Sequence, residues 1–483
     1  MVKKKIYSSL ILVLVFFFMR AQNYHAIQGS SLAGSIGVHN NPSSIVNTPY
    51  NWDITLLGAQ AKSSTNIIEV RNYSLFTSPR RSEYIFKAGN YNRSGITNEN
   101  VNLLNTRIAL NRHQAIAFGA NLRNYAFTRT SEYNFIDTLK NVGDFLSLNE
   151  SNQPLGGDFV NSGWIELYAS YAQTIIDNAN SRLNAGITLK VSRGFSGAQA
   201  SLQNGKFGRI PAGDPATYSI NEANTLFGYS SNYDRWQNGS SKMQNLRNFL
   251  SFTEGGASLD LGAEFLIKSQ AVPSYGEEDF YDYDWKLGIS LLDVGVNQFK
   301  YGLQSRSTSG VKAGVTDVTL DQKFDSTIRS MKDFNDSLAT IVTQFSSLSG
   351  KFRIINPTRL VANADRYLLG NLYINAELSI NLSAIFGKKW LYVKEMNILT
   401  VTPRWETRQW GFFMPLSYNT QKQFWVGGAV KAGPILFGLH NLAYIFSQKS
   451  IHKGGGYIAI IIRSPNDTGK KHDKQLDCPP VKR

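Results

Sequence analysis

Several features that would indicate a soluble enzyme are scarce in this sequence. It has one cysteine, Cys478, which excludes an intramolecular disulfide and a multi-thiolate zinc site. Its six histidines are scattered and include no His-x-His or His-x3-His pair, so a zinc-hydrolase centre is not expected. Charged residues make up only 18% of the chain, against about 25% in typical globular proteins. Beyond residue 19, no apolar run reaches the length of about 18 residues that a transmembrane helix needs.

Uncharged polar residues take the place of the missing charge. The 483 residues include 40 glycines and 42 asparagines, and the formal net charge is +15. Gly and Asn favour turns and disfavour long helices, so this composition indicates many strands joined by turns. The cations are dispersed along the chain, so we expect them to serve solubility or to meet lipopolysaccharide, and we expect no nucleic acid partner.

The N-terminus has the pattern of a secretory signal peptide. Lys3, Lys4 and Lys5 precede an apolar run from Ile6 to Met19, and Ala21-Gln22 offers a small-residue cleavage site. The apolar run is too short to cross a bilayer as a helix. We therefore predict that residues 1–21 are a signal peptide and that the chain is exported.

Long alternation of apolar and polar residues is the dominant pattern between residues 50 and 463. It runs almost unbroken through 182–192, 257–268 and 371–382. Side chains of a strand point alternately to opposite faces, so each run has one apolar and one polar face. Strands of soluble sheets average about five or six residues, whereas a tilted membrane-spanning strand needs about nine to eleven. The runs are of the longer kind, which favours a membrane barrel over a secreted β-sandwich or propeller.

The predicted fold is an all-β outer-membrane barrel of about 14 (12–16) antiparallel strands formed by residues 51–463. Tight connections and long polar ones such as 128–162 indicate the short turns and long loops of such barrels. The tight connections are Asn111–Gln114, Asp177–Ser181, Thr420–Lys422 and Ala432–Pro434. Aromatic residues near strand ends would form the interfacial girdles: Trp52, Trp164, Trp285, Trp410, Tyr418, Tyr444 and Tyr457.

Residues 22–50 do not alternate, yet they precede the first strand. We predict that they enter the lumen as a plug, with Leu32 and Ile36 buried and Asn41-Pro42 leading into the wall. At the other end, 464–483 is a polar, Lys-rich stretch that we predict to be a periplasmic tail carrying the free thiol of Cys478.

A second non-wall segment, 321–348, has helical periodicity. Apolar residues recur every three or four positions, with charged residues between them and no Gly or Pro before residue 348. We predict an amphipathic helix that either packs on the protein's own loops or binds a partner. Its apolar stripe consists of Phe324, Ile328, Met331, Leu338, Ile341 and Phe345.

Catalytic and cofactor motifs were not found. There is no Gly-x-Ser-x-Gly elbow, phosphate-binding glycine loop, His-Glu-x-x-His helix or complete calcium loop, so we expect no enzyme activity, no cofactor and no metal. The acidic loop around 277–284 is more simply a solvated loop than a Ca²⁺ or partner site.

The polar strand faces should carry charges of both signs into the lumen. A pore selective for one kind of ion would show one sign, so a balanced set indicates ion pairs across the lumen or contacts with a plug. The predicted lumen-facing residues are Arg107, Arg123, Glu166, Lys190, Asp260, Glu264, Lys268, Lys286 and Glu377.

Three phrases of the sequence carry a family resemblance. Asn40-Asn41-Pro42-Ser43 before the first strand, Leu259–Ala263 and Leu291–Gly295 resemble phrases of the FadL-type barrels, the long-chain fatty acid transporters, and of their PorV-like relatives in type IX secretion. The resemblance implies a 14-strand barrel plugged by its N-terminal segment, with ligand leaving sideways through the wall. The insertion 321–348 and the tail depart from that pattern, which indicates an uncharacterised branch.

Two functions remain open from the sequence. As a FadL-like barrel, the protein would pass small hydrophobic molecules across the outer membrane, and an apolar cavity should lie between plug and wall. As a partner of a secretion or surface-assembly machine, it should have a sealed lumen and an apolar docking patch on its outer cap. In both cases it would reside in the bacterial outer membrane among lipid and lipopolysaccharide.

Overall fold

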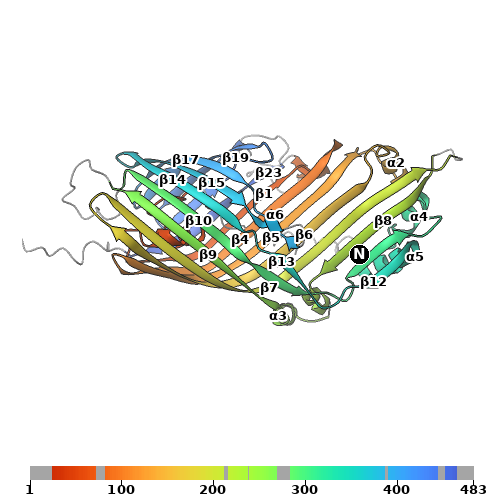
Figure 1. The fold of residues 1–483 in the computed structure, drawn as a ribbon, viewed down its shortest axis with the longest axis horizontal. Helices are drawn as coiled ribbons and strands as arrows, with labels where there is room; N and C mark the ends of the chain where they lie inside the picture. Colours follow the sequence, from red (N-terminus) through yellow and green to blue (C-terminus); the bar gives the residue numbers. More distant parts are fainter. Residues whose placement is uncertain are drawn as a thin grey trace, which may run out of the picture.

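The described part of the chain is a closed antiparallel barrel of 14 strands. Figure 1 shows the barrel from the side. The computed structural model describes residues 24, 26–71, 82–211, 216–237, 239–268, 283–386, 390–443 and 452–464. The barrel closes because β1 (Trp52–Thr65) pairs with β23 (Lys453–Arg463) on one edge and with β4 (Gly89–Asn111) on the other. Closure leaves no open edge in the wall, as a sheet surrounded by lipid requires. The predicted fold class is confirmed.

The other wall strands follow one another in chain order. Two positions each combine two short strands: β18 is continued by β19, and β20 by β21. Going round from β4, the remaining positions are β5 (Gln114–Phe135), β6 (Leu155–Asp177), β7 (Ser181–Arg209), β9 (Glu254–Ile267), β10 (Trp285–Lys300), β14 (Arg359–Leu369), β15 (Leu372–Asn381), β17 (Ile398–Glu406), β18 (Trp410–Phe413) with β19 (Leu416–Asn419), β20 (Phe424–Val426) with β21 (Gly428–Ala432), and β22 (Ile435–Leu439).

The two ends of the barrel differ. At the turn end, short connections at 112–113, 178–180, 370–371 and 433–434 join the strands, and β1 begins and β23 ends there. Long connections with helices gather at the opposite, loop end, on the right of Figure 1. The tight turn predicted at 420–422 lies at the loop end, between β19 and β20. In outer-membrane barrels the short turns are periplasmic and the long loops extracellular.

The wall exposes its apolar residues and buries its polar ones. On β7 the exposed fractions alternate along four consecutive residues. Leu189 is 62% exposed and Val191 63%, whereas Thr188 is 1% and Lys190 4% exposed. The solvent that such an exterior matches is lipid, since in water this pattern would be inverted. Among the described residues, no helix has the length and apolar character to cross a membrane. The apolar exterior of the closed barrel identifies the protein as a bacterial outer-membrane barrel, as predicted.

Extra strands extend the wall at the loop end. The loop-end half of β7 pairs with β8 (Tyr218–Tyr229), and β8 pairs with β11 (Arg306–Val311). Strand β11 in turn pairs with β12 (Val342–Ser347). The helices α2 (Val142–Ser147), α4 (Asp317–Lys323) and α5 (Met331–Ile341) lie beside these strands (Figure 1). The hairpin of β2 (Ile68–Arg71) and β3 (Glu83–Phe86) forms a separate sheet.

The single helix predicted over 321–348 is wrong. Residues 324–330 separate α4 from α5, because Asp325 accepts hydrogen bonds from the backbone and hydroxyl of Thr327, and Ser330 caps a new helix by accepting from Asp333 N. Beyond Ile341 the chain becomes strand β12, which contains Phe345. Pairing with β11 overrides the helical period there.

The predicted apolar stripe packs mainly against the protein itself. Leu338 and Ile341 are buried, and Phe324 and Phe345 pack on their cluster together with residues of β8 and β11. Ile328 is half-buried, and Met331 is exposed. The stripe therefore supports the loop-end extension, and only Met331 is clearly available to a partner.

Four predicted features lie outside the described residues. They are the signal peptide 1–21, the acidic residues 277–282, the girdle residue Tyr444 and the tail from 465 onward with Cys478.

A charge placed in the exterior band should test the assignment of lipid as its solvent. Ile187→Arg lies in the middle of the β7 band and should lower the free energy of unfolding in vesicles by about 2–4 kcal/mol, because it puts a cation into hydrocarbon. Leu202→Arg, on the same strand in the loop-end extension, should cost less than about 1 kcal/mol. Urea titration followed by tryptophan fluorescence measures both, and equal losses at the two sites would contradict a membrane-embedded wall.

Candidate functional site

The N-terminal segment, residues 24 and 26–50, lies inside the barrel near the turn end. It contains two short 3-10 helices, η1 (Gly34–His39) and η2 (Pro42–Ile45). Asn41 caps η2 by accepting from Ser43 N, and Pro42 occupies the first helical position, where no N–H is required. Gly34 has φ +61°, and a Cβ there would collide with the Asp53 carboxylate, so only glycine fits this close approach to β1.

Hydrogen bonds tie this segment to strands all round the wall. Ser35 donates from its backbone to Asp53, and its hydroxyl lies 2.8 Å from that of Thr55 on β1. Asn40 Nδ2 donates to Glu377 Oε2 on β15 at 2.8 Å, and Ser30 Oγ donates to Glu406 Oε2 on β17 at 2.6 Å. The segment is thus centred in the lumen by contacts on several sides.

Wall glycines make room for η2. Gly186 on β7 pairs with Gly262 on β9, and a Cβ on either would collide with the Asn41–Ser43 turn. Asn41 Nδ2 donates to the backbone of Ala263 at 3.0 Å next to this point. Both glycines stand at inward positions where the alternation of their strands calls for a polar side chain. Sequence analysis did not single them out, although an inward glycine in an alternating run could have indicated a close contact inside the barrel.

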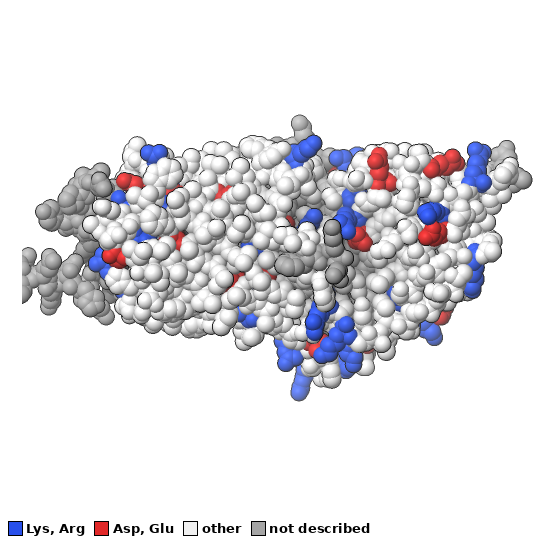
Figure 2. Space-filling model, viewed as in Figure 1, with Lys and Arg blue, Asp and Glu red and all other residues white. Residues whose placement is uncertain are grey.

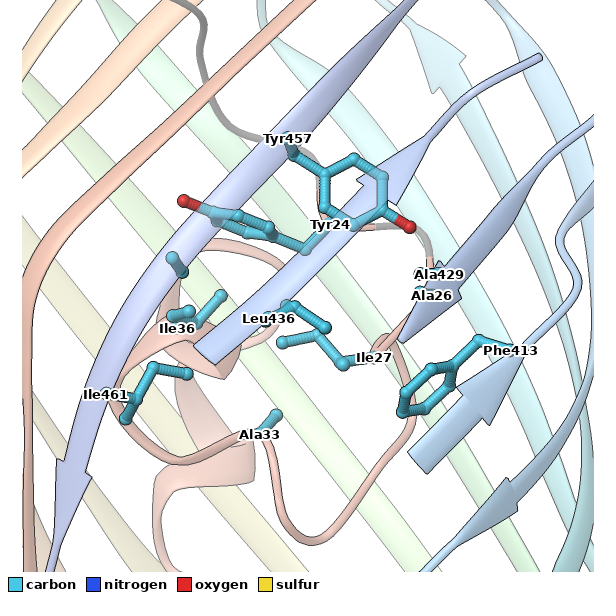
Figure 3. Close-up of a cluster of buried hydrophobic side chains, with 11 residues drawn as sticks. Tyr24, Ala26, Ile27, Ala33, Ile36, Phe413, Ala429, Leu436, Tyr457 and Ile461 are labelled. Atoms are coloured by element: carbon cyan, nitrogen blue, oxygen red, sulfur yellow. The ribbon is translucent and has the colours of Figure 1, made fainter. Parts of the chain in front are cut away.

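An apolar cluster holds the other side of the segment, as Figure 3 shows. Ile36 is buried in it, whereas the other predicted apolar plug residue, Leu32, is half-buried and accepts from Arg463 through its carbonyl. Here β18 and β21 to β23 carry apolar side chains on their inward face as well. The members are Tyr24, Ala26, Ile27, Ala33, Ile36, Phe413, Ala429, Leu436, Tyr457, Ala459 and Ile461.

A second segment, 390–397, fills the lumen from the loop end. It follows α6 (Ser383–Phe386) and includes β16 (Leu391–Tyr392), which pairs in parallel with β13 (Lys351–Ile355). Met396 packs with Ile96, Phe127 and Trp425 of the wall. No local pattern indicates this insertion, because the segment neither alternates nor shows a helical period.

Glu395 anchors the inserted segment. Its carboxylate lies 2.6 Å from Lys62 Nζ and 3.1 Å from Arg359 Nη1. Burial raises the pKa of Glu395, but the charges of Lys62 and Arg359 outweigh burial and lower that pKa to about 2. Arg359 also donates to the backbone oxygen of His39 at 3.2 Å, so one wall arginine holds both segments that fill the lumen.

The middle of the lumen holds a network of charges. Arg123 binds Asp293 through two hydrogen bonds of 2.5 and 2.7 Å, and Lys190 lies 2.7 Å from both Asp293 and Asp260. Asp293 sits at an irregularity of β10 with φ +58°, which turns its carboxylate inward beside the buried Leu292. Nearer the turn end, Arg404 binds Asp365 in the same two-pronged way at 2.6 and 2.7 Å.

Eight of the nine predicted lumen residues are buried in the interior: Arg107, Arg123, Glu166, Lys190, Asp260, Glu264, Lys286 and Glu377. Lys268 is not. It follows the last residue of β9 and binds Asp177 at 2.6 Å beside the turn at 178–180, so the alternation was carried one step too far.

Sequence reasoning missed more buried charges than it found: eight of the 20 buried charged residues described were predicted, and 12 were not. Lys62, Asp365, Arg404, Glu406 and Lys431 lie on alternating strands, so their parity could have identified them. Asp293 could not be found by parity, because the bulge shifts it. Among the described residues, buried cations and buried anions number ten each, which excludes a lumen lined by one sign of charge.

The cavity between the N-terminal segment and the wall is small. It has a volume of about 40 Å³ and is bounded by residues such as Tyr24, His39, Asn40 and Asn363. A water needs roughly 10–15 Å³ measured this way, so the space suits a few waters and no larger guest. The apolar cavity expected of a transporter is not present at this place.

A larger hollow, of about 490 Å³, lies on the outward face of β17 to β22. Its outward-facing lining is apolar and aromatic: Trp405, Phe412, Met414, Val430, Phe437 and Leu442. Phe413 and Ala429 form its floor, and both belong to the inner apolar cluster that contacts the N-terminal segment. Part of the inner face of the wall behind the hollow is therefore apolar, although the buried Arg404 of β17 also lines the hollow.

Comparison with known proteins identifies a family. A family of unknown function, DUF5723, matches residues 42–440, which is most of the chain. The chain belongs to this family. A comparison with curated proteins finds no match.

Solved barrels resemble the chain only distantly. A FadL homologue from Pseudomonas aeruginosa is 10% identical with a TM-score of 0.38, and the match covers 90% of this chain and 95% of that one. The toluene transporter TodX of P. putida is 8% identical with a TM-score of 0.39, with 89% and 92% covered. Both are likenesses of the barrel fold alone.

Breaking the Glu395 ion pairs should release the inserted segment. Glu395→Gln leaves Lys62 and Arg359 buried without this counter-charge, at a cost of about 3–5 kcal/mol, so trypsin should cleave after Lys394 much faster. In the parent protein the pairing stabilises the segment above the ordinary glutamate pKa and is lost as the pH falls from about 4.5 toward about 2. Glu222→Gln, which breaks an exposed pair with Lys206, is the matched control and should change nothing. Mass spectrometry of the peptides gives the rates, and an unchanged Lys394 cut would contradict the anchoring role.

Proposed function

We propose that this protein passes small apolar molecules across the outer membrane, and that they exchange with lipid at the hollow on β17 to β22. The position of the hollow carries the proposal, since it opens in the apolar exterior where Pro403 lies within β17 and Pro415 stands between β18 and β19. Pro403 and Pro415 have no N–H to donate, and prolines in sheets occur at weak points of the ladder. Met414 N donates to Pro403 O at 3.1 Å and Gly427 N to Pro415 O at 2.7 Å, while the prolines donate nothing in return.

The partition behind the hollow is partly apolar. Phe413 and Ala429 line the hollow and belong to the apolar cluster that also contains Ala26 and Ile27, while the charged Arg404 lines the hollow beside them. A volume of about 490 Å³ lies within the range of about 300–1,000 Å³ for small-molecule pockets. A molecule without hydrogen-bonding groups could cross here without leaving a buried polar group unsatisfied.

Passage requires the N-terminal segment to move, because the cavity beside it is far too small for a guest. Its attachments favour such movement. Most are side-chain hydrogen bonds such as those of Ser35 and Asn40, and water can replace these as the segment shifts. The wall strands keep their own pairing throughout.

A second candidate is a sealed barrel that serves a secretion or surface-assembly machine. The filled lumen favours it, since two segments and paired charges of both signs occupy the part of the interior that the structure describes. Its apolar contact on the loop-end extension would be limited to exposed residues such as Met331 and Val318.

Locking the N-terminal segment to the wall distinguishes the two candidates. Ser35→Cys with Thr55→Cys, in a Cys478→Ser background, places two thiols where hydroxyls now lie 2.8 Å apart. Oxidation should reduce entry of the apolar dye N-phenyl-1-naphthylamine to the rate of cells lacking the protein, and dithiothreitol should restore it. Ser170→Cys with Thr188→Cys, whose hydroxyls lie 2.6 Å apart on β6 and β7, ties two wall strands and should have no effect.

Two results would count against passage. Equal dye entry in the oxidised and reduced lock would exclude the segment as a gate. The second is dye entry no faster than in cells without the protein, measured in a host with an intact lipopolysaccharide leaflet. That result would favour the sealed barrel that serves a secretion or surface-assembly machine.

Filling the hollow tests the exchange site. Val430→Trp adds a ring to its lining and should slow dye entry at least about fivefold if guests use this space. Ile187→Trp makes the same kind of change at an outward position of similar exposure on β7 and should leave entry unchanged. If both variants pass dye like the parent, exchange occurs elsewhere.

A further inference from the structure

A short segment projects sideways from the wall between β8 and β9. It comprises residues 231–237 and 239–252, with η4 (Ser231–Arg235) and α3 (Lys242–Ser251). Figure 1 shows α3 beside the barrel rather than over its loop end. It begins near the point where β7 stops pairing with β9 and starts pairing with β8, which is on the loop-end side of Gly194.

A row of outward-facing polar side chains runs round the wall at the same level along the barrel axis as this segment. Asn124 Nδ2 donates to Glu99 Oε2 at 3.2 Å, Asn161 Nδ2 to Asn124 Oδ1 at 2.8 Å, and Ser196 Oγ to Asn161 Oδ1 at 2.8 Å. The row crosses β4 to β7 and lies on the loop-end side of the apolar band, which on β7 ends at Val191, before the exposed Arg193. A lateral row of hydrogen-bonded polar groups cannot face hydrocarbon without cost, so it marks the lipid–water boundary on the loop-end side.

The segment joins this row and presents an apolar surface next to it. The Tyr233 hydroxyl lies 2.7 Å from Ser196 Oγ, which fixes η4 at the boundary. Phe249 packs against Tyr233 and Trp236, with ring centroids 5.3 and 6.4 Å apart, and so fills the inner side of α3. The remaining large apolar side chains are exposed: Met243 at 74%, with Leu246, Leu250, Trp236 and Phe252.

Cations surround this apolar surface. Arg235, Lys242 and Arg247 within the segment are exposed, and Arg193 of the wall reaches it by donating to Thr253 O at 2.9 Å. Its one acid, Asp234, already accepts from Tyr229 OH at 2.6 Å and Leu303 N at 2.7 Å. Figure 2 shows Lys and Arg gathered on this protrusion.

We propose that residues 231–237 and 239–252 form an interfacial anchor for anionic glycolipid of the outer leaflet. The apolar face of α3 enters the acyl region beside the barrel, and Arg193, Arg235, Lys242 and Arg247 bind the lipid A phosphates. Continuity with the apolar band places lipid at the helix, and the cations match phosphate in charge. An apolar face of this size, rimmed by cations at a membrane boundary, fits a lipid surface better than water.

Depth measurement is the first test. The full-length barrel carrying Met243→Cys, in the Cys478→Ser background, is labelled with a nitroxide and placed in vesicles containing lipopolysaccharide. Its label should collide preferentially with oxygen dissolved in lipid. Met331→Cys, an exposed methionine of α5 in the loop-end extension, is the matched control, and its label should collide with a water-soluble nickel chelate. A Met243 label as open to nickel as the Met331 label would overturn the anchor.

Lipid A retention is the second test. Native mass spectrometry of the detergent-purified barrel counts bound lipid A, and Lys242→Glu with Arg247→Glu should lower retention at least about tenfold. Lys323→Glu with Lys332→Glu reverses two exposed cations of the loop-end extension and should leave retention unchanged. Retention that is unaltered by the first pair, or lowered equally by both pairs, would overturn specific phosphate binding, and dye entry through the barrel would be unaffected by that failure.

Discussion

Charge pairing in the filled lumen is the constraint on which the rest of this structure depends. Lipid on the outside requires apolar outward side chains, and alternation then sends the charges of every strand inward. Two segments occupy the lumen, so those charges lose their water, and an unpaired buried charge costs on the order of several kcal/mol. The two-pronged Arg123–Asp293 and Arg404–Asp365 pairs, and Lys190 between two carboxylates, are solutions to that constraint.

The same constraint links the two ends of the barrel. Arg359 binds Glu395 of the segment that enters from the loop end and the His39 backbone of the segment that enters from the turn end. Movement of either segment therefore changes the surroundings of one arginine that the other segment also uses. The apolar cluster around Ile36 has no such coupling, and it borders the outward hollow at Phe413 and Ala429. An opening that starts on the apolar side would spare the contacts of Arg359, which is why we place exchange there.

The sequence predicted the site in part, and the failures have physical causes. Parity along regular strands placed eight charged residues in the lumen, because side chains alternate as long as the ladder is unbroken. It failed at Lys268, where the strand ends, and at Asp293, where an irregularity of β10 changes the parity. Glu395 has no local signal at all, since its segment is positioned only by distant partners, Lys62 and Arg359. The helix predicted over 321–348 was interrupted by the Asp325–Thr327 turn and replaced by strand pairing beyond Ile341.

The sequence by itself determined that one face of each strand meets lipid and the other the interior, and therefore that the chain forms a membrane barrel. It also determined the long strands and short turns of that barrel. Alternation and run length are local properties of the chain, so they can be read without the fold. Tertiary structure alone decided what fills the barrel. Three features depend on residues that are far apart in sequence and meet across the lumen. They are the inserted segment 390–397, the packing of η2 against Gly186 and Gly262, and the apolar cluster between the N-terminal segment and β18 to β23. Such contacts arise only when the ring of strands closes and fixes the distance between its opposite sides.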